Sequence, residues 1–350
     1  MGTLASLLDS HHTTFMQRYA HRLSAAQRQA IHAIRRCRTL DSGECRMRCE
    51  ACDHSHSHPL SCGHRSCPQC QHHEATQWLD RQREKLLPVD YFMVTFTLPA
   101  QLRALAWRYQ NEMYSLLFSC IASTLKDFGL NPKHLGADIG MTAILHTHTR
   151  RLDYHPHVHV VVPGGGVDAQ KKQWKKTKNK FLFNAFALAK VFRARYLQAL
   201  KMANLPIPPG IPGKWVVDCK SVGRGEPALK YLSRYLYRGV IGEKNIIAHA
   251  NGHVTFRYRE GSTGQWKTRT LAVIDFLWHV LQHVLPKGFR RVRDYGFLHG
   301  NAKQRLRLVQ WVLRVIIQAA TPKTRPVVMC PFCQSPMRIV AWIRPAPKAG

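Results

Sequence analysis

Three histidines alternate with other residues in one short segment of this sequence. The segment reads His155-Pro-His157-Val-His159 and continues into a run of valines. Alternate side chains of a β-strand point to the same face, so His157 and His159 project together, with Cα atoms roughly 6.5 to 7 Å apart. Two imidazoles on one rigid strand can chelate a metal ion. The pattern therefore predicts a divalent-metal site at His157 and His159.

The third ligand of this site is open at the level of sequence. His155 shares the same face if the strand begins there, and His146 lies opposite His157 if the preceding turn is centred near Arg151-Leu152. A group from elsewhere in the chain is the remaining alternative. A His-x-His pair by itself is more often polar surface than a metal site. Here the valines on the opposite face indicate a central, buried strand, which favours the metal site.

A pair of tyrosines follows about seventy residues later. Pro227 suits the first turn of a helix, in which Tyr231 and Tyr235 stand four residues apart and side by side. Tyrosine hydroxyls can act as nucleophiles that form covalent intermediates. The alternative is packing at the edge of a core, the usual fate of such residues. Arg234 and Arg238 fall on the neighbouring face, where we expect them to hold phosphates.

Two Cys-x2-Cys pairs near the N-terminus have the spacing of zinc ligands. Cys49 and Cys52 precede Cys67 and Cys70 by fourteen intervening residues, and four thiolates can hold one Zn²⁺ with Zn–S distances of ~2.3 Å. Buried cysteines without a metal are the alternative. Further candidate ligands leave room for a substituted ligand or a second ion, namely Cys45, His54, His56, His58, Cys62 and His64.

A third such pair, Cys330-Pro-Phe-Cys333, lies near the C-terminus. It is half of another metal site, and its missing ligands could be His279 and His283, which share one helical face. A turn without metal is the alternative.

The charge of the chain points to a polyanionic partner. It has 52 Lys and Arg against 20 Asp and Glu, a net charge of +32, and nucleic acid is the first candidate for such a field. No apolar run of membrane-spanning length supports a membrane partner. In the segment 171–180, tryptophan stands among lysines that can bind phosphates while the ring stacks on a base. The predicted DNA contacts there are Lys171, Lys172, Trp174, Lys175 and Lys176.

The predicted elements alternate between strands and helices. Strands are expected at 91–98, 141–148, 157–162 and 215–219, a hairpin at 246–260 with its turn at Asn251-Gly252, and helices within 1–36 and at 102–128, 181–203 and 271–285. This order predicts an α+β fold. We expect a helical and zinc-binding N-terminal domain over 1–85, a central domain over 86–300 with an antiparallel sheet and packed helices, and a basic C-terminal helix with the Cys-Pro-x-Cys tail over 301–350.

These motifs together resemble a known family. His157-Val158-His159 and Tyr231-Leu-Ser-Arg-Tyr235 look like the two signature motifs of the two-tyrosine HUH endonucleases. The wider context is similar to the rolling-circle transposases of the insertion sequence ninety-one family. That context comprises Ser66–Cys70, Val94–Pro99, His155–Gly165, Tyr231–Arg238, Asp294–Gly300 and the late Cys-Pro-x-Cys.

The resemblance implies a reaction and its partners. Mg²⁺ or Mn²⁺ held by His157 and His159 would polarise a phosphate of single-stranded DNA at the ends of a mobile element. Tyr231 or Tyr235 would attack it, giving a 5′-phosphotyrosine and a free 3′-OH, and the second tyrosine would allow transfer to target DNA. Zn²⁺ would be structural. Paired cysteines without a secretion signal favour a reducing cytoplasm, so we expect a bacterial, nucleoid-associated protein. Its oligomeric state is open.

Two other functions remain as alternatives. A rolling-circle replication initiator uses the same chemistry. The zinc-bearing N-terminus and the late Cys-Pro-x-Cys favour the transposase, and preference for element ends over a replication origin would distinguish the two. A zinc-containing DNA-binding regulator without enzymatic activity would need neither Tyr231 nor Tyr235.

Overall fold

The computed structural model describes residues 3–70, 72–168, 170–177, 181–225, 227, 229, 240–261, 263–316 and 327–344, and the side chains of all of these except 72–76. They form two compact units, each assembled from segments distant in sequence. The first unit contains Met1–His73, Arg238–Val284 and Gln318–Gly350; the second contains Glu74–Tyr237 and Leu285–Ile317. The three-part linear division at residues 85 and 300 stays a prediction. Within the described ranges, no helix is long and apolar enough to cross a membrane.

Helices and two small sheets make up the first unit. The helices are α1 (Leu4–Ser10), α2 (His12–Tyr19), α3 (Ala25–Arg36) and α9 (Val273–Leu281). Ser24 and Gln27 form a capping box at the start of α3, which satisfies backbone N–H groups that a helix start leaves unpaired. The Gln27 side chain also donates to the Leu281 carbonyl at 3.0 Å, tying α3 to α9. The helices expected within 1–36 are confirmed, with α1 ending at Ser10 and α3 beginning after Ser24.

One small sheet of this unit has the strand order β11-β10-β9. Its strands are β9 (Ile246–Ala250), β10 (His253–Arg259) and β11 (Trp266–Ala272). The predicted Asn251-Gly252 turn is confirmed, because both residues have the positive φ (51° and 71°) that such a hairpin requires. The helix expected from Leu271 is wrong at both ends, since Leu271 belongs to β11 and α9 covers only Val273–Leu281.

The other small sheet joins the two ends of the chain. Its order is β13-β1-β2, with β1 at Glu44–Cys49, β2 at Ser55–Pro59 and β13 at Met337–Ile343. Strand β13, which the sequence analysis missed, pairs antiparallel with β1. The buried face is small, and its residues are Cys45, Met47, Cys49, Cys330 and Met337.

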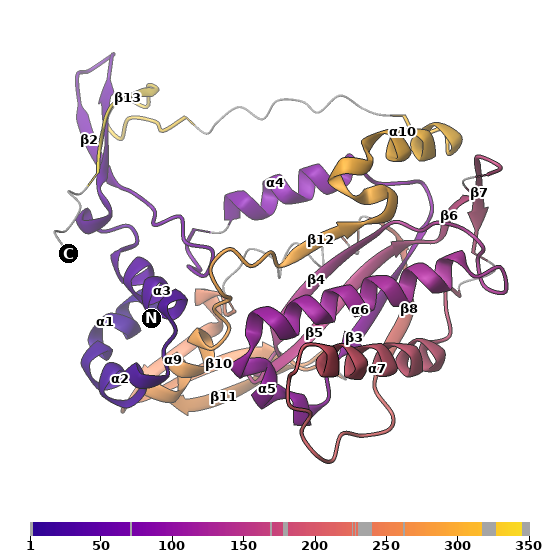
Figure 1. The fold of residues 1–350 in the computed structure, drawn as a ribbon. Coiled ribbons are helices and arrows are strands. Elements are labelled where there is room, and N and C mark those ends of the chain that lie inside the picture. Colours follow the sequence, from indigo (N-terminus) through magenta and orange to yellow (C-terminus); the bar gives the residue numbers. More distant parts are fainter. Residues whose placement is uncertain are drawn as a thin grey trace. The chain divides into compact units, whose positions relative to one another are not determined.

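The second unit is built on a five-stranded antiparallel sheet in the order β12-β4-β5-β3-β8. The strands are β3 (Asp90–Thr97), β4 (Met141–His148), β5 (Tyr154–Pro163), β8 (Val217–Arg224) and β12 (Val292–Tyr295). The four predicted strands of this unit are present, although β5 begins three residues earlier than expected and β8 covers Val217–Arg224 where the prediction was 215–219. The antiparallel α+β prediction is therefore confirmed (Figure 1).

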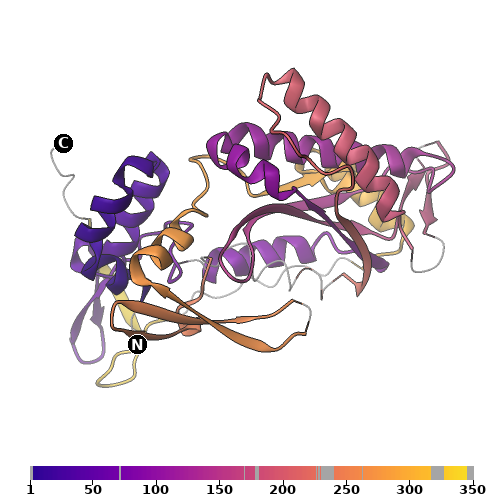
Figure 2. The same ribbon diagram turned by 90° about the horizontal axis from the view of Figure 1, so that it is seen from below.

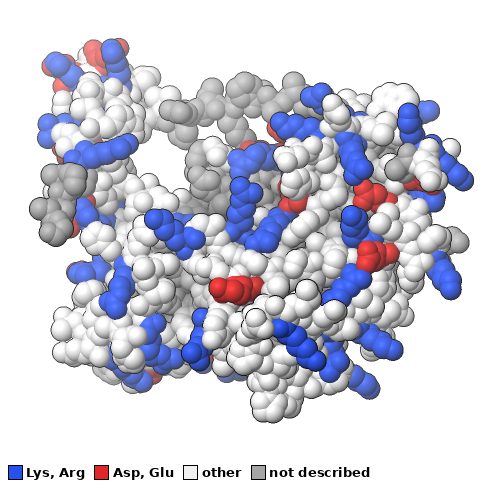
Figure 3. Space-filling model, viewed as in Figure 1, with Lys and Arg blue, Asp and Glu red and all other residues white. Residues whose placement is uncertain are grey.

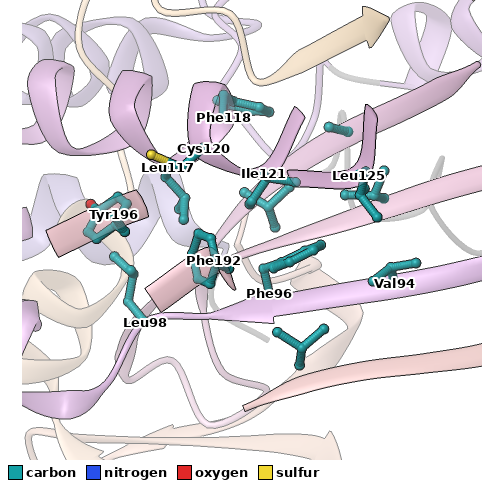
Figure 4. Close-up of a cluster of buried hydrophobic side chains, with 14 of the residues drawn as sticks. Val94, Phe96, Leu98, Leu117, Phe118, Cys120, Ile121, Leu125, Phe192 and Tyr196 are labelled. Atoms are coloured by element: carbon teal, nitrogen blue, oxygen red, sulfur yellow. The ribbon is translucent and has the colours of Figure 1, made fainter. Parts of the chain in front are cut away.

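Two long helices, α6 (Gln110–Leu130) and α7 (Ala185–Met202), cover one face of this sheet (Figures 1 and 2). The single helix expected over 102–128 is divided, because Tyr109 leaves helical geometry (φ −120°, ψ 55°) between α5 (Arg103–Arg108) and α6. The core between sheet and helices is aromatic and aliphatic (Figure 4). In it Phe96 of β3 meets Phe192 of α7 edge to face, with ring centroids 5.0 Å apart, an arrangement that the ring quadrupoles favour.

The opposite face of the sheet carries a smaller apolar cluster. Helix α4 (His72–Arg83) contributes Trp78, which packs with Tyr91, Ile144, Val161 and Leu229, and Figure 2 shows the sheet between α4 and the α6–α7 pair. Three further elements lie in this unit: β6 (Gly165–Asp168), β7 (Gln173–Lys176) and α10 (Lys303–Val312).

Candidate metal centre and zinc sites

Three histidines converge on the sheet face opposite α6 and α7. His146 lies on β4, and His157 and His159 lie on the neighbouring strand β5; one ring nitrogen from each falls within 4.8 Å of the others. His146 and His157 are direct cross-strand partners. Their ring centroids lie 5.3 Å apart, and the ring of His159 is 4.6 Å from His146 and 4.9 Å from His157.

Strand alternation explains why these side chains share a face. Val158 and Val160 are fully buried in the core beneath α6 and α7, so the intervening His157 and His159 must project to the other side. The sequence analysis expected this division of β5, and the structure confirms it. The pairing of β4 with β5 shifts register between His146 and His148, where β5 contributes one residue more than β4; such irregularities are common beside active sites.

The third histidine is His146 and not His155. Among the alternatives open from sequence, cross-strand register brings His146 to the pair. The ring of His155 is instead in contact with Arg103, whose guanidinium donates to His155 Nδ1 at 2.7 Å. Because that nitrogen accepts a hydrogen bond from a permanent cation, we expect His155 to support the site and not to bind the ion.

Hydrogen bonds orient two of the three rings. His157 Nδ1 lies 2.7 Å from the His155 carbonyl oxygen; a carbonyl can only accept, so Nδ1–H is the donor and Nε2 keeps its lone pair. His159 Nδ1 lies 2.9 Å from the hydroxyl of Thr95 on β3, its direct cross-strand partner. Such outer contacts fix the ring orientation of metal-binding histidines. Sequence reasoning missed Thr95, although its place in the predicted strand 91–98 was the available signal.

Burial keeps the histidines neutral. Burial is the largest cause that lowers the pKa of His146 well below its usual value, and the charges of neighbouring histidines lower it further. Burial likewise lowers the pKa of His157 and lowers that of His159 to about 3. Neutral imidazole is the form that binds metals, so the triad is prepared for a cation. Three nitrogen ligands fit a divalent ion, but imidazole prefers softer metals than Mg²⁺.

The candidate nucleophiles, Tyr231 and Tyr235, lie outside the described residues, as do Arg234 and Arg238. The chain just before them is described at Leu229, which is buried on the histidine face. There it packs in one cluster with Ile144 and Val161, and Ile144 is the cross-strand partner of His159.

Eight cysteines form two separate tetrads in the first unit. One contains Cys37, Cys62, Cys67 and Cys70, and the other contains Cys49, Cys52, Cys330 and Cys333; within each, the sulfur atoms lie within 4.8 Å of one another. The closest sulfur pairs are 3.3 to 3.6 Å apart. A tetrahedral Zn²⁺ with bonds of ~2.3 Å separates its sulfurs by about 3.8 Å, so both tetrads have the dimensions of zinc sites.

This arrangement corrects the expected pairing of the cysteines. Cys49 and Cys52 do not meet Cys67 and Cys70, and the partners of Cys330 and Cys333 are Cys49 and Cys52, not His279 and His283. The reason lies in the tertiary structure, because the pairing of β13 with β1 brings Cys330 and Cys333 to Cys49 and Cys52. Sequence reasoning did not name Cys37 as a ligand and considered Cys62 as a substituted ligand or a ligand of a second ion.

The second tetrad is held by two turns of the same design. The backbone N–H of Asp53 donates to the Cys49 carbonyl, and that of Gln334 donates to the Cys330 carbonyl, both at 3.0 Å. Both residues have positive φ, 58° and 57°, which closes each turn so that the two thiols point the same way. The backbone N–H of Ser335 is the largest cause that lowers the pKa of Cys333, to about 6, and thiolate is the metal-binding form.

The described part of the lysine-rich segment, residues 171–177, belongs to a hairpin of two strands, β6 and β7. Strands β6 and β7 pair from Gly165 opposite Lys176 to Asp168 opposite Gln173. Trp174 is half-buried against Phe297, with ring centroids 6.0 Å apart. Its indole therefore serves packing, and base stacking by Trp174 remains only a prediction. Lys175 pairs with Asp168 at 2.9 Å. The lysines left exposed here are Lys171, Lys172 and Lys176.

Comparisons with known proteins match the N-terminal cysteine-containing segment and the histidine-containing segment to two separate families. Residues 7–98 match the family described as "Transposase zinc-binding domain", and residues 140–305, which include the histidine triad, match the family described as "Putative transposase".

Curated relatives extend the match over most of the chain. "Putative transposase y4qJ" of Sinorhizobium fredii is 36% identical over 82% of this chain and 78% of its own length. "Transposase for insertion sequence element IS801" of Pseudomonas savastanoi pv. phaseolicola is 30% identical over 75% of this chain and 68% of its own. A solved structure, "Conjugative Relaxase TrwC in complex with OriT Dna", shares 15% identity over 65% of this chain and 73% of that one, with a TM-score of 0.29.

Proposed function

The chain belongs to the insertion sequence ninety-one family of transposases, and from this premise we propose that it cleaves and transfers single-stranded DNA through a phosphotyrosine intermediate. The observation that carries the proposal is the triad of His146, His157 and His159 on one sheet face, with hydrogen bonds to the rings of His157 and His159. The apolar anchor Leu229, two residues before Tyr231, packs on that same face.

The three histidines would hold one divalent ion through neutral ring nitrogens. When bound, such an ion supplies Lewis-acid polarisation of a phosphate oxygen. Thr95 and the carbonyl of His155 hold two of the rings in place, so little reorganisation is needed when a phosphate arrives. The family resemblance implies Mg²⁺ or Mn²⁺, whereas imidazole ligands suit softer divalent ions better than either.

The tyrosines of the 231–235 segment supply the nucleophile. The hydroxyl oxygen of one tyrosine attacks phosphorus, the bond from phosphorus to the 3′ oxygen breaks, and that oxygen leaves with a proton as a free 3′-OH. The tyrosine retains the 5′-phosphate, so the energy of the broken bond is kept for rejoining. The second tyrosine can then cleave another strand, which makes transfer possible without an external energy source.

We also propose that each cysteine tetrad holds one structural Zn²⁺. Four thiolates with no open position are typical of structural zinc. A site made from Cys49, Cys52, Cys330 and Cys333 would fasten strand β13 to the N-terminal segment.

A covalent-adduct assay tests the catalytic proposal. The protein is mixed with 3′-labelled single-stranded oligonucleotides from the element ends, with Mn²⁺ or without added divalent ions, and resolved on a denaturing gel. We expect an ion-dependent adduct that disappears in the Tyr231→Phe/Tyr235→Phe variant. Retention of the adduct in that double variant would refute the nucleophile assignment. Tight DNA binding with no adduct on authentic ends would favour a regulator.

The same assay identifies the third ligand. His146→Ala should reduce adduct formation as severely as His157→Ala, because both remove a ligand. His155→Ala is the matched control from the same cluster and should keep much more activity. The reverse order of severity would assign the ligand to His155.

A further inference from the structure

A long basic depression lies along the edge of the five-stranded sheet, next to β12. Two adjoining cavities of about 900 and 1080 Å³ open there and share His299, Gly300 and Asn301 in their walls. We call them together the β12 groove. Its walls carry six cationic side chains: Lys287, Arg290, Arg293, Lys303, Arg305 and Arg307. Figure 3 shows Lys and Arg side chains around this part of the second unit, with few Asp or Glu among them.

Most of this positive charge is available to a ligand. Lys287, Arg290, Lys303 and Arg307 are exposed, and none of them forms an ion pair with a carboxylate in the part of the chain that the structure describes. The acidic side chain in the wall, Asp294, already has hydrogen-bond partners. Its carboxylate accepts hydrogen bonds from Lys85 and from Thr142, both at 2.6 Å.

The floor of the groove is rigid. Strand β12 pairs with β4, and the next residue, Gly296, has φ +60°, with the position of an added Cβ only 1.9 Å from the Ile139 carbonyl oxygen. Gly140 is similarly closed, because its Cβ would lie 2.5 Å from the ring of Phe297. This close backbone packing fixes the turn that carries His299 and the start of α10, so the groove is formed before any ligand binds.

One end of the groove lies at the level of the histidine triad along β4, at the edge of the same sheet. Val292 of β12 pairs with Ile144, and the N–H of Leu145 donates to the Arg291 carbonyl at 2.9 Å, one residue before His146. From that level β12 runs toward Met141, its last partner on β4. Five residues of strand span about 17 Å, which at one phosphate per 3.4 Å of a stacked strand is room for on the order of five phosphates.

We propose that the β12 groove binds the sugar-phosphate backbone of single-stranded DNA at the edge of the sheet that carries the histidine triad. A run of exposed cations on a rigid floor fits a repeating phosphate chain. The inference rests on the proposed function for the identity of the ligand, and it adds where the strand lies.

The test compares two variants that each lose four positive charges. The groove variant is Lys287→Ala/Arg290→Ala/Lys303→Ala/Arg307→Ala. The control replaces four exposed lysines on and beside α6 and α7 by alanine: Lys126, Lys133, Lys190 and Lys201. Binding of a fluorescent 20-nucleotide single strand is measured by anisotropy from 0.05 to 0.4 M NaCl without added divalent ions. Thermal melting of both variants shows that they are folded.

Each lost phosphate contact should reduce the slope of log K against log salt concentration by about 0.7. The slope for the groove variant should therefore be smaller by about 2.8. Extrapolated from equal affinities at ~1 M salt, this corresponds to about 600-fold weaker binding at 0.1 M salt. The control should keep a slope within about 0.7 of the unmodified protein. Equal losses in the two variants would reduce the effect to net charge and overturn the inference, as would an unchanged groove variant.

The adduct assay separates this inference from the proposed function. If the unmodified protein forms no adduct but only the groove variant loses binding, the groove stands and the catalytic proposal fails. If adduct forms normally in the groove variant at low DNA concentration, the groove fails and the catalytic proposal stands.

Discussion

Replacing Thr95 by valine tests whether the histidine triad is an oriented metal site. Valine keeps the β-branched shape and the strand position of threonine but removes the hydroxyl that lies 2.9 Å from His159 Nδ1. The residues are direct cross-strand partners, so no other side chain of β3 can replace that contact. Without it, the ring of His159 loses the hydrogen bond that holds its orientation.

The expected magnitude follows from the role of such outer contacts. Loss of one hydrogen bond to a metal-binding histidine reduces metal affinity about 10- to 100-fold, which is about 1.4 to 2.7 kcal/mol. We therefore expect Thr95→Val to weaken Mn²⁺ binding by that factor while the folded state persists.

Strand β3 offers a matched control. Thr97 lies two residues further on the same face and is the cross-strand partner of His157, whose Nδ1 is bonded to the His155 carbonyl instead. Thr97→Val should leave Mn²⁺ affinity within about threefold of the unmodified protein, since it removes no contact to a ligand.

The assay is Mn²⁺ titration followed by electron paramagnetic resonance, with the cysteine tetrads kept loaded with zinc. Equal Mn²⁺ affinities for Thr95→Val and the unmodified protein would refute the reasoning. Equal losses in the two threonine variants would also refute it, because they would reflect a general change in the strand.

Three further predictions concern the rest of the chain. The purified protein should contain two zinc ions per chain by elemental analysis, and Cys330→Ser/Cys333→Ser should contain one; an unchanged value of two would remove the second tetrad from the proposal. Gly296→Ala should destabilise the second unit by about 2 to 5 kcal/mol, because the alanine would have a positive φ and would be overpacked. The control Gly288→Ala should cost about 1 to 2 kcal/mol, because its φ is +75° but nothing lies within 4 Å of an added Cβ. Equal melting temperatures for the two variants would contradict this prediction. Asp294→Ala should cost about 1.5 to 3 kcal/mol, because it removes hydrogen bonds involving a charged group, and a melting temperature unchanged by this variant would show that the contacts contribute nothing.

The sequence alone determined the local features of the sites. Strand alternation placed His157 and His159 on one face, because the period of two is a property of the backbone and needs no tertiary contact. The Asn251-Gly252 hairpin and the helix start at Ser24 were predictable for the same reason, since turn and cap chemistry are encoded within a few residues. The spacing of each Cys-x2-Cys pair likewise identified a half-site for zinc.

Only the tertiary structure decided how these parts combine. His146 joins the triad through the register of β4 against β5, and register depends on which faces are buried across the whole sheet. The cysteine pairs sorted into tetrads because β13 pairs with β1, bringing together Cys49 and Cys333, which are 284 residues apart. The β12 groove depends on the close packing of Gly296 against Ile139. Contacts of such long range leave no periodic trace in a single sequence, so residue spacing defined the half-sites and the fold assembled them.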